Sequence, residues 1–248
     1  MTMENINDDI MTVIKRIAIA RTETEVKSLT EFVVKRAGGE LFAYSISRPN
    51  KDDQLCDLYH HFENCDPRWR ATYNSRKWFM NDPLIEYAKS NTEAIASSKI
   101  EPKTQGQVDM LSTAAQHGFC SGIVIPTQSS LGAREWLGIL LVGSSLEPAA
   151  GENILMANRV ELRALAMELM EWWKNYFKRD AIYRFKIQEQ DINILRQLKN
   201  GKSVLEIAAI LDLKANSLYR DIRVLKGKLK ALKTQEVVQR AKFYGLLS

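Results

Sequence analysis

Apolar residues alternate between two kinds of pattern in the first two thirds of the chain. Helical spacing predicts helices at Asp8–Ala20, Thr22–Arg36, Pro67–Lys77, Pro83–Ser90 and Gln105–His117. Short apolar runs between turn-forming residues predict strands at Leu41–Ser47, Gln54–Phe62, Phe119–Pro126 and Trp136–Ser144. After them, Glu152–Arg179 is interpreted as one long helix and Asp180–Lys186 as a linker. The mixture predicts an α+β domain over residues 1–179.

The remaining residues, 187–248, show helical spacing only. Four short helices fit, at Gln188–Lys199, Val204–Leu211, Asn216–Leu229 and Thr234–Phe243. Gly201 supplies a permissive backbone after the first, and Ser203 is a typical N-cap for the second. The second and third are separated only by the tight turn Asp212–Lys214, which is the spacing of a helix-turn-helix. We expect a small all-α domain here.

The third of these helices separates into an apolar and a polar face. Leucine and isoleucine recur as one buried stripe, at Leu218, Ile222, Leu225 and Leu229. The opposite side carries Asn216, Tyr219, Arg220, Arg223 and Lys226. Arginine pairs with guanine and asparagine with adenine in the major groove, so this face is suited to reading DNA. Residues placed for phosphates are Lys202, Lys214, Ser217 and Lys226. The alternative is a small helical bundle with a solvated basic face.

Charge and composition favour the DNA-binding interpretation. Residues 181–248 hold 14 Lys and Arg against 6 Asp and Glu, a net charge of +8, whereas the rest of the chain has 21 against 24, or −3. Three scattered cysteines give neither a disulfide framework nor a metal site, and we expect no cofactor and a reducing cytoplasm. An enzyme is rejected, because paired carboxylates, a nucleophile motif and a phosphate-binding glycine loop are missing from the sequence. No membrane segment or signal peptide is expected.

The last domain resembles the helix-turn-helix of LuxR-type quorum-sensing regulators. The resemblance is carried by Leu195, Gly201-Lys202-Ser203, Glu206-Ile207-Ala208, Leu211 and Lys228-Leu229. Two positions depart from the family's pattern. Asp212 stands where the family usually has glycine in the turn, and Lys214 stands where a helix-capping serine is common.

The resemblance extends to the first domain. The family has a Trp, a Tyr four residues later and an Asp-Pro nine residues after that, matched by Trp69, Tyr73 and Asp82-Pro83. A second match is His117–Pro126, which contains the family's Ser-Gly pair with Gly122. The resemblance implies an α–β–α sandwich with an antiparallel sheet that holds an acyl-homoserine lactone. It implies that Trp69 donates to the lactone carbonyl, Tyr73 bonds the amide carbonyl and Asp82 accepts from the amide N–H.

Each of these residues also has a simpler interpretation. Asp82 before Pro83 is an ideal helix start, so it can be an N-cap, and the two roles are compatible. Trp69 and Tyr73 at a spacing of four can be ordinary core residues. Gly122 allows a close backbone approach in a sheet.

The expected pocket departs from the family at three positions. Cys65 replaces a tyrosine, Ser97 a tryptophan and Leu141 a polar residue. The lost volume predicts a wider, more apolar pocket that suits a long acyl tail, with Trp78 and Trp136 as candidates to fill the gap.

The expected function is therefore a transcriptional regulator that binds double-stranded DNA under the control of a small apolar signal. The alternative is a ligand-independent regulator of the same architecture, acting constitutively or through a partner subunit. We also expect a homodimer, because Glu152–Arg179 with Trp172 and Trp173 carries more apolar surface than one sheet needs to cover, and paired half-sites are usual for such proteins. RNA polymerase is a further expected partner.

Overall fold

The computed structural model describes residues 9–48, 58–129 and 136–247, which form two compact units that divide between Trp172 and Trp173. The helices of the first unit are α1 (Ile10–Ile17), α2 (Glu23–Arg36), α3 (Pro67–Ser75), α4 (Pro83–Ser90), α5 (Gln105–Gln116), α6 (Pro148–Ala157) and the start of α7 (Arg159–Arg184), with the 3-10 turns η1 (Trp78–Met80) and η2 (Ser97–Lys99). Its strands are β1 (Leu41–Arg48), β2 (Leu58–Glu63), β3 (Ile95–Ala96), β4 (Ser121–Ser129) and β5 (Trp136–Ser144).

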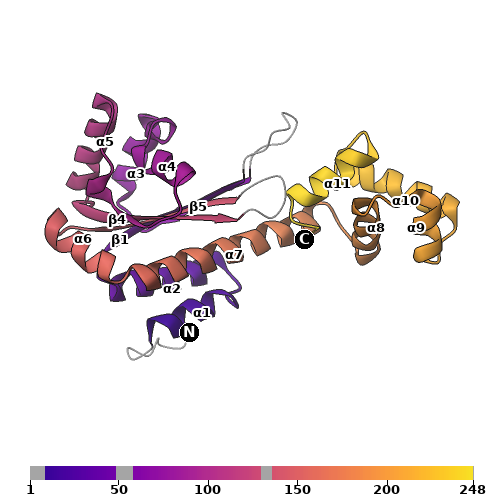
Figure 1. Cartoon of the computed structure of the whole chain (residues 1–248), viewed down its shortest axis with the longest axis horizontal. Coiled ribbons are helices and arrows are strands. Elements are labelled where there is room, and N and C mark those ends of the chain that lie inside the picture. The colour runs from indigo at the N-terminus through magenta and orange to yellow at the C-terminus, as the bar shows by residue number, and fades with distance from the viewer. Residues whose placement is uncertain (1–8, 49–57, 130–135, 248) are drawn as a thin grey trace. The chain divides into compact units, whose positions relative to one another are not determined.

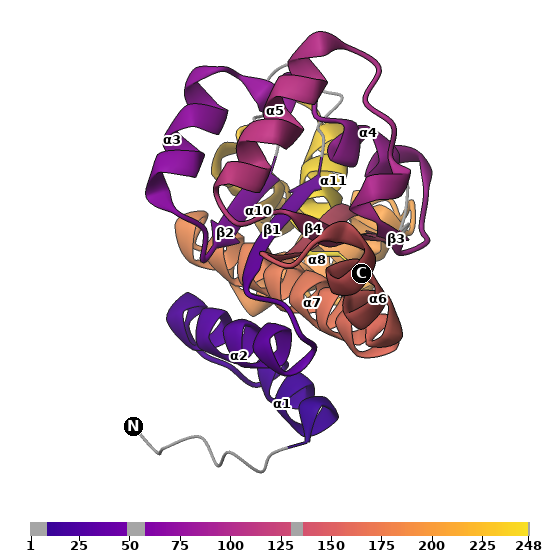
Figure 2. The same ribbon diagram turned by 90° about the vertical axis from the view of Figure 1, so that its left-hand side faces the viewer.

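The five strands form one antiparallel sheet in the order β2-β1-β5-β4-β3. Helices α3, α4 and α5 lie over one face of this sheet, and α2 and the first part of α7 lie over the other (Figures 1 and 2). The predicted α–β–α sandwich with an antiparallel sheet is confirmed.

The two faces of the central strands differ in how well they are sealed. In β1 and β5 the even-numbered side chains, such as Tyr44 and Leu140, are fully buried on the side of α2 and α7. The odd-numbered side chains point to the opposite face, because side chains alternate along a strand. On that face most of them are only half-buried, as Ala43 and Leu141 are. One side of the sheet is therefore closed core, and the other retains accessible apolar surface beneath α3–α5.

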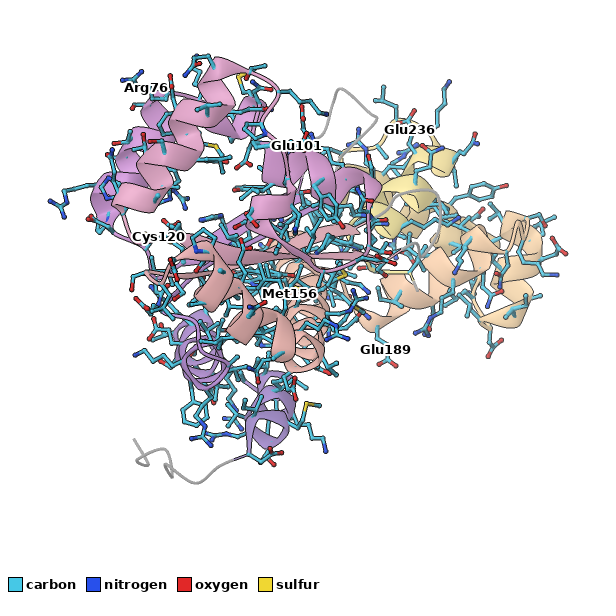
Figure 3. The ribbon with its side chains drawn as sticks, turned by 60° about the vertical axis from the view of Figure 1, so that its left-hand side comes forward. Arg76, Glu101, Cys120, Met156, Glu189 and Glu236 are labelled. Atoms are coloured by element: carbon cyan, nitrogen blue, oxygen red, sulfur yellow. The ribbon has the colours of Figure 1, made fainter. Side chains whose placement is uncertain are left out.

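The predicted long helix at Glu152–Arg179 is wrong in its start and its continuity. The structure has two helices instead, and α6 ends where the Asn158 side chain donates to the backbone oxygen of Ile154 at 3.0 Å. A side chain that bonds its own backbone in this way competes with the helical pattern. Figure 3 labels Met156 close to this break.

The segment Asp180–Lys186, predicted as a linker, is mostly helical, because α7 continues to Arg184. Asp180 and Arg184 form an ion pair across one helical turn at 2.5 Å, which favours the helix. Lys186 then takes a left-handed backbone, φ +50°, and ends the helical path. The short elements η1, β3 and η2 were not predicted.

Several other boundaries are close to the prediction. The strand predicted at Gln54–Phe62 corresponds to β2, and its first residues lie outside the described part of the chain. Asp8, the predicted start of the first helix, also lies outside the described part of the chain.

The second unit contains α8 (Glu189–Lys199), α9 (Val204–Ile210), α10 (Ala215–Lys228) and α11 (Thr234–Phe243), in agreement with the four predicted helices. Ser203 caps α9 by accepting from the Glu206 N–H, and Glu206 accepts from the Ser203 N–H in return. Lys228 of α10 pairs with Asp191 of α8 at 2.5 Å, which holds the third helix against the first. Glu189 and Glu236, labelled in Figure 3, mark the first turns of α8 and α11.

Candidate functional site

The three residues of the Trp-Tyr-Asp signature lie together beneath the helical layer of α3–α5. Trp69, buried on α3, lies with its ring centroid 5.5 Å from that of Tyr73 and 6.4 Å from that of Phe119. Met110 and Ala114 of α5 complete the cluster from the other side. No residue in the described part of the chain accepts a hydrogen bond from the indole N–H of Trp69, so this donor is available to another molecule.

Asp82 joins this cluster to the start of α4. Its Oδ1 accepts from the backbone N–H of Leu84 at 2.8 Å and of Ile85 at 3.4 Å, so the predicted N-cap role is confirmed. Its Oδ2 accepts from the Tyr73 hydroxyl at 2.6 Å. Burial raises the pKa of the Asp82 carboxyl, and the bonds from Tyr73, Leu84 and Ile85 counteract part of that rise. The carboxylate keeps unused lone pairs on Oδ2, and therefore can accept one further N–H.

Tyr73 has a single hydroxyl hydrogen, and this hydrogen is engaged with Asp82. It cannot at the same time be donated to a ligand carbonyl. The role expected for Tyr73 therefore requires the phenol to exchange its partner when a ligand enters. Burial, with the adjacent Asp82 carboxylate, raises the pKa of Tyr73 far above 10, so the phenol stays a donor.

The four remaining residues predicted for the pocket do not form one group. Cys65 packs against the aromatic cluster, and its thiol donates to the Phe42 carbonyl at 3.3 Å. Gly122 and Leu141 are neighbours on β4 and β5, where a Cβ on Gly122 would lie 3.6 Å from the Leu141 side chain. Ser97 lies near Gly122, but its hydroxyl donates to the buried carboxylate of Glu152 on α6 at 3.1 Å.

Glu152 also accepts from the backbone N–H and the hydroxyl of Ser98, at 2.9 and 2.5 Å. A buried carboxylate with three donors is a structural anchor. Ser97 therefore ties η2 to α6, whereas the sequence alone had placed it in the pocket wall.

Of the two tryptophans considered as replacements for the missing aromatics, the structure brings only one to the cluster. Trp78 of η1 lies 5.8 Å from Trp69 and 6.4 Å from Tyr73, centroid to centroid. Trp136 belongs to the even-numbered, sealed face of β5, where the Arg48 guanidinium lies 5.1 Å from its ring centroid. Phe119, just before Cys120 at the entry to β4 (Figure 3), was not predicted to belong to this cluster. Its ring occupies the space over Gly143.

A line of polar groups at the β2 edge of the same face was missed by the sequence analysis. Ser45 and His61 are directly opposite each other on β1 and β2, with Ser45 Oγ 2.8 Å from His61 Nδ1. His61 Nε2 lies 3.0 Å from Glu63, and Glu63 pairs with Arg70 of α3 at 2.9 Å. The period of two in Ser45-Ile46-Ser47 and His61-Phe62-Glu63 could have placed these side chains on one face, but only the strand register could join them.

In the second unit, α10 has the two predicted faces. Leu218, Ile222 and Leu225 are buried within the helical bundle. Asn216, Tyr219, Arg220 and Arg223 are exposed on the other side, and Lys226 and Ser217 are half-buried. Lys202 and Lys214 are exposed as well, so all eight residues predicted for DNA are accessible to some extent. Asp221, the acid on this helix, lies 3.8 Å from the Arg220 guanidinium and accepts from Gln190 at 3.0 Å.

The turn before α10 explains one departure from the family's pattern. Asp212 has φ +52°, the left-handed region that favours glycine and in which aspartate is tolerated. Lys214 occupies the N-cap of α10 without a side-chain cap bond, so the start of this helix lacks the serine-type cap.

Two kinds of feature are missing from the described residues. These residues contain no cluster of three or more His, Cys, Asp or Glu that could hold a metal ion. In the same ranges there is no helix with the length and apolar character required to cross a membrane.

The model of the autoinducer binding domain matches residues 22–171. No curated protein sequence matches the chain. Among solved structures, Escherichia coli SdiA is similar, with 18% identity, coverage of 96% of this chain and 98% of that chain, and a TM-score of 0.63.

Two further structures resemble the chain. SdiA in complex with octanoyl-rac-glycerol has 16% identity, covers 99% and 98% of the two chains and has a TM-score of 0.64. The N-acylhomoserine lactone dependent LuxR family transcription factor CepR2 from Burkholderia cenocepacia has 16% identity, covers 64% of this chain and 92% of that one and has a TM-score of 0.52. These likenesses show a shared fold. Because the family model covers residues 22–171, more than half of the chain, the chain belongs to the autoinducer-binding-domain family, as the resemblance of its first domain implied.

Proposed function

We propose that this chain regulates transcription by binding duplex DNA through α10 in response to an acyl-homoserine lactone held between the sheet and helices α3–α5. The observation that carries the proposal is the grouping of Trp69, Tyr73 and Asp82. Their signature spacing in the sequence becomes one cluster in space, with a free indole donor and a buried carboxylate that has an open acceptor site. A mostly apolar ligand needs only a few such polar groups in an apolar site.

The ligand's polar head fits this cluster. Its amide N–H is accepted by Asp82 Oδ2, its lactone carbonyl accepts from Trp69, and its amide carbonyl takes the Tyr73 hydrogen after the phenol leaves Asp82. The exchange costs little, because the ligand N–H replaces the phenol at the carboxylate. Two similar proteins are associated with an acyl compound: SdiA forms a complex with octanoyl-rac-glycerol, and CepR2 depends on an N-acylhomoserine lactone.

The acyl tail follows the half-sealed face of the sheet. From Leu141 past Ile139 to Leu137, β5 offers half-buried apolar side chains over a length of about 13 Å. Each buried methylene contributes about 0.8 kcal/mol, so a chain that fills this length binds far better than a short one. We therefore keep the preference for a long acyl tail as part of the proposal.

Thermal stabilisation by a series of acyl-homoserine lactones of rising chain length tests the signal. The wild type should be stabilised, with the largest shift for long chains. Asp82→Ala should lose the shift, and Asp66→Ala is the matched control, because Asp66 also caps a helix and also precedes a proline. Asp66→Ala should lower the melting temperature but retain the ligand shift. Stabilisation by none of the lactones would favour the ligand-independent regulator.

DNA binding is tested with the full chain and labelled duplexes of different sequence. Arg223→Ala should cost about 1–3 kcal/mol on a preferred sequence and reduce discrimination, whereas Lys214→Ala should weaken all duplexes alike. Arg196→Ala removes an exposed cation from α8 and serves as the control. Binding without salt dependence, or equal losses in all three variants, would contradict a role for α10.

A homodimer is also part of the proposal, although one of the two predicted reasons for it, the apolar surface of Trp172 and Trp173, is wrong. Trp172 and Trp173 are buried within the chain, and the Trp172 indole donates to the Ala20 carbonyl at 2.9 Å. What supports the dimer is the exposure of Val160 and Met167, seven residues apart on α7 and so on one side of the helix. Sedimentation of the full chain with and without lactone is the test, and a monomer in both states would contradict it. RNA polymerase remains a predicted partner.

A further inference from the structure

Ser45 lies within the proposed signal site, on the same face of the sheet as the apolar residues beneath α3–α5. Leu41, four residues earlier on β1, faces this side, since its side chain lies 3.0 Å from the Cβ position of Gly118 after α5. Side chains of one strand alternate, so Ser45 points to the same face. Across the sheet Ser45 is opposite Ile139 on one side and His61 on the other. Its hydroxyl therefore borders the path assigned to the acyl tail.

The direction of the Ser45 hydrogen bond is set by the groups behind it. Burial alone raises the pKa of the Glu63 carboxyl, but the hydrogen bond from His61 and the nearby Arg70 guanidinium hold this pKa below 4.5. Glu63 is thus a carboxylate and can only accept, so His61 carries its hydrogen on Nε2. When the ring carries this one hydrogen, His61 Nδ1 is bare, and Ser45 donates its only hydrogen to it, over 2.8 Å.

We propose that Ser45, fixed in this direction by His61 and Glu63, is a specificity-determining hydrogen-bond acceptor that selects a signal with a hydroxyl group on its acyl chain. This inference rests on the proposed function and narrows its ligand class. The Ser45 oxygen retains lone pairs but no free hydrogen. A chain hydroxyl can donate to it, whereas a keto oxygen at the same carbon brings lone pairs against lone pairs. A plain methylene at that carbon leaves the lone pairs of the Ser45 oxygen without a donor.

The test compares three acyl-homoserine lactones of equal length that carry a 3-hydroxyl, a 3-keto group or neither. Dissociation constants for the full chain are measured by calorimetry at about pH 8, where neutral imidazole is the ordinary form of histidine. The wild type should bind the hydroxyl compound about tenfold more tightly than either of the others, the value of one net hydrogen bond.

Two variants and a control separate the explanation from a general loss of fit. Ser45→Ala removes the acceptor, so the tenfold ratio should fall to about one. Glu63→Gln keeps the shape but offers an amide N–H to His61 Nε2. The hydrogen can then move to Nδ1, freeing the Ser45 hydrogen, so the ratio should fall or invert towards the keto compound. Ser47→Ala, on the same strand and face and also half-buried, should leave the ratio unchanged.

The outcomes are distinguishable. Equal binding of all three lactones by the wild type, or a preference for the keto compound, would overturn the role of Ser45 while leaving the proposed function intact. A wild-type preference that survives Glu63→Gln unchanged would overturn the fixed direction of the hydrogen bond. Binding of none of the three would overturn the proposed lactone signal together with this inference.

Discussion

Replacing Tyr73 with phenylalanine isolates one bond at the centre of the candidate site. The phenol hydrogen bonds Asp82 Oδ2 at 2.6 Å, a distance typical of a hydroxyl bound to a carboxylate. Asp82 is only 7% exposed, so water cannot replace the lost donor freely. A hydrogen bond to a charged group contributes about 1.5–3 kcal/mol. Tyr73→Phe should therefore lower the free energy of unfolding by about 2 kcal/mol, and the folding equilibrium constant by roughly thirtyfold.

The size of this loss should depend on pH. Because burial raises the pKa of Asp82 above 3.8, the folded chain binds this proton more readily than the unfolded chain. Asp82 therefore disfavours folding increasingly as the pH rises through its folded-state pKa. The Tyr73 hydroxyl lowers that pKa and limits the effect. Tyr73→Phe removes this hydroxyl, so the loss in free energy of unfolding should be largest when Asp82 is ionised. The loss should shrink as the pH falls.

The assay is urea unfolding of the full chain, followed by tryptophan fluorescence at about pH 8 and about pH 4.5. Tyr87→Phe is the matched control, because the Tyr87 hydroxyl donates to a neutral carbonyl, that of Glu93, at 3.1 Å in an exposed position. Its loss should be at most about 0.5 kcal/mol at either pH. If Tyr73→Phe costs no more than this control, or costs the same at both pH values, the argument for a charged bond at Asp82 fails.

Three further predictions follow from other parts of the molecule. Gly143→Ala places a Cβ 2.2 Å from the Phe119 ring, so it should cost about 1–3 kcal/mol in a thermal unfolding experiment; an unchanged melting temperature would contradict the role of Phe119 as a filler. Lys214→Ser supplies the missing cap of α10 and should stabilise the second unit by about 1 kcal/mol while weakening DNA binding, and a loss of stability would refute the cap. Burial lowers the pKa of His60 from 6.5, so the folded chain resists its protonation and stability should fall as the pH drops below that value. His60→Gln should flatten this decline, and an identical pH profile would exclude His60 as its source.

The sequence predicted the elements whose signals are local. Helices with strong spacing, such as Pro83–Ser90, and the four helices of the second unit agree with the structure to within one or two residues. Capping residues such as Ser203 and Asp82 were identified because the N-cap bond involves only neighbours in the sequence.

What the sequence could not predict depends on partners far apart in the chain. Ser97 was assigned to the pocket, and only the packing of α6 shows that its hydroxyl belongs to Glu152, 55 residues later. Trp136 was weighed as a pocket residue because a single aromatic gives no sign of which face of the sheet it occupies. The line from Ser45 to Arg70 was missed for the same reason, since it is created by strand register and by an ion pair to α3.

The break at Asn158 and the helical course of Asp180–Arg184 show another limit. Both depend on side-chain bonds of a few tenths of a kilocalorie to about 1 kcal/mol, which decide between a helix and a turn when the apolar spacing permits either. Apolar periodicity is an average over many residues, so it does not predict a helix end that depends on one side-chain bond.

The unequal sealing of the two faces of the sheet has a consequence for how this chain can diverge. Substitutions at even-numbered positions of β1 and β5 disturb the closed core and destabilise the fold. Selection therefore removes most of them, independently of which signal the protein binds. Substitutions at odd-numbered positions touch accessible surface and cost less, so they can accumulate and alter what the protein senses. A mutational scan should show this as a tolerance that alternates with every residue along each strand. The same fold could thus acquire a new ligand through substitutions at the odd-numbered positions alone, with every intermediate sequence still able to fold.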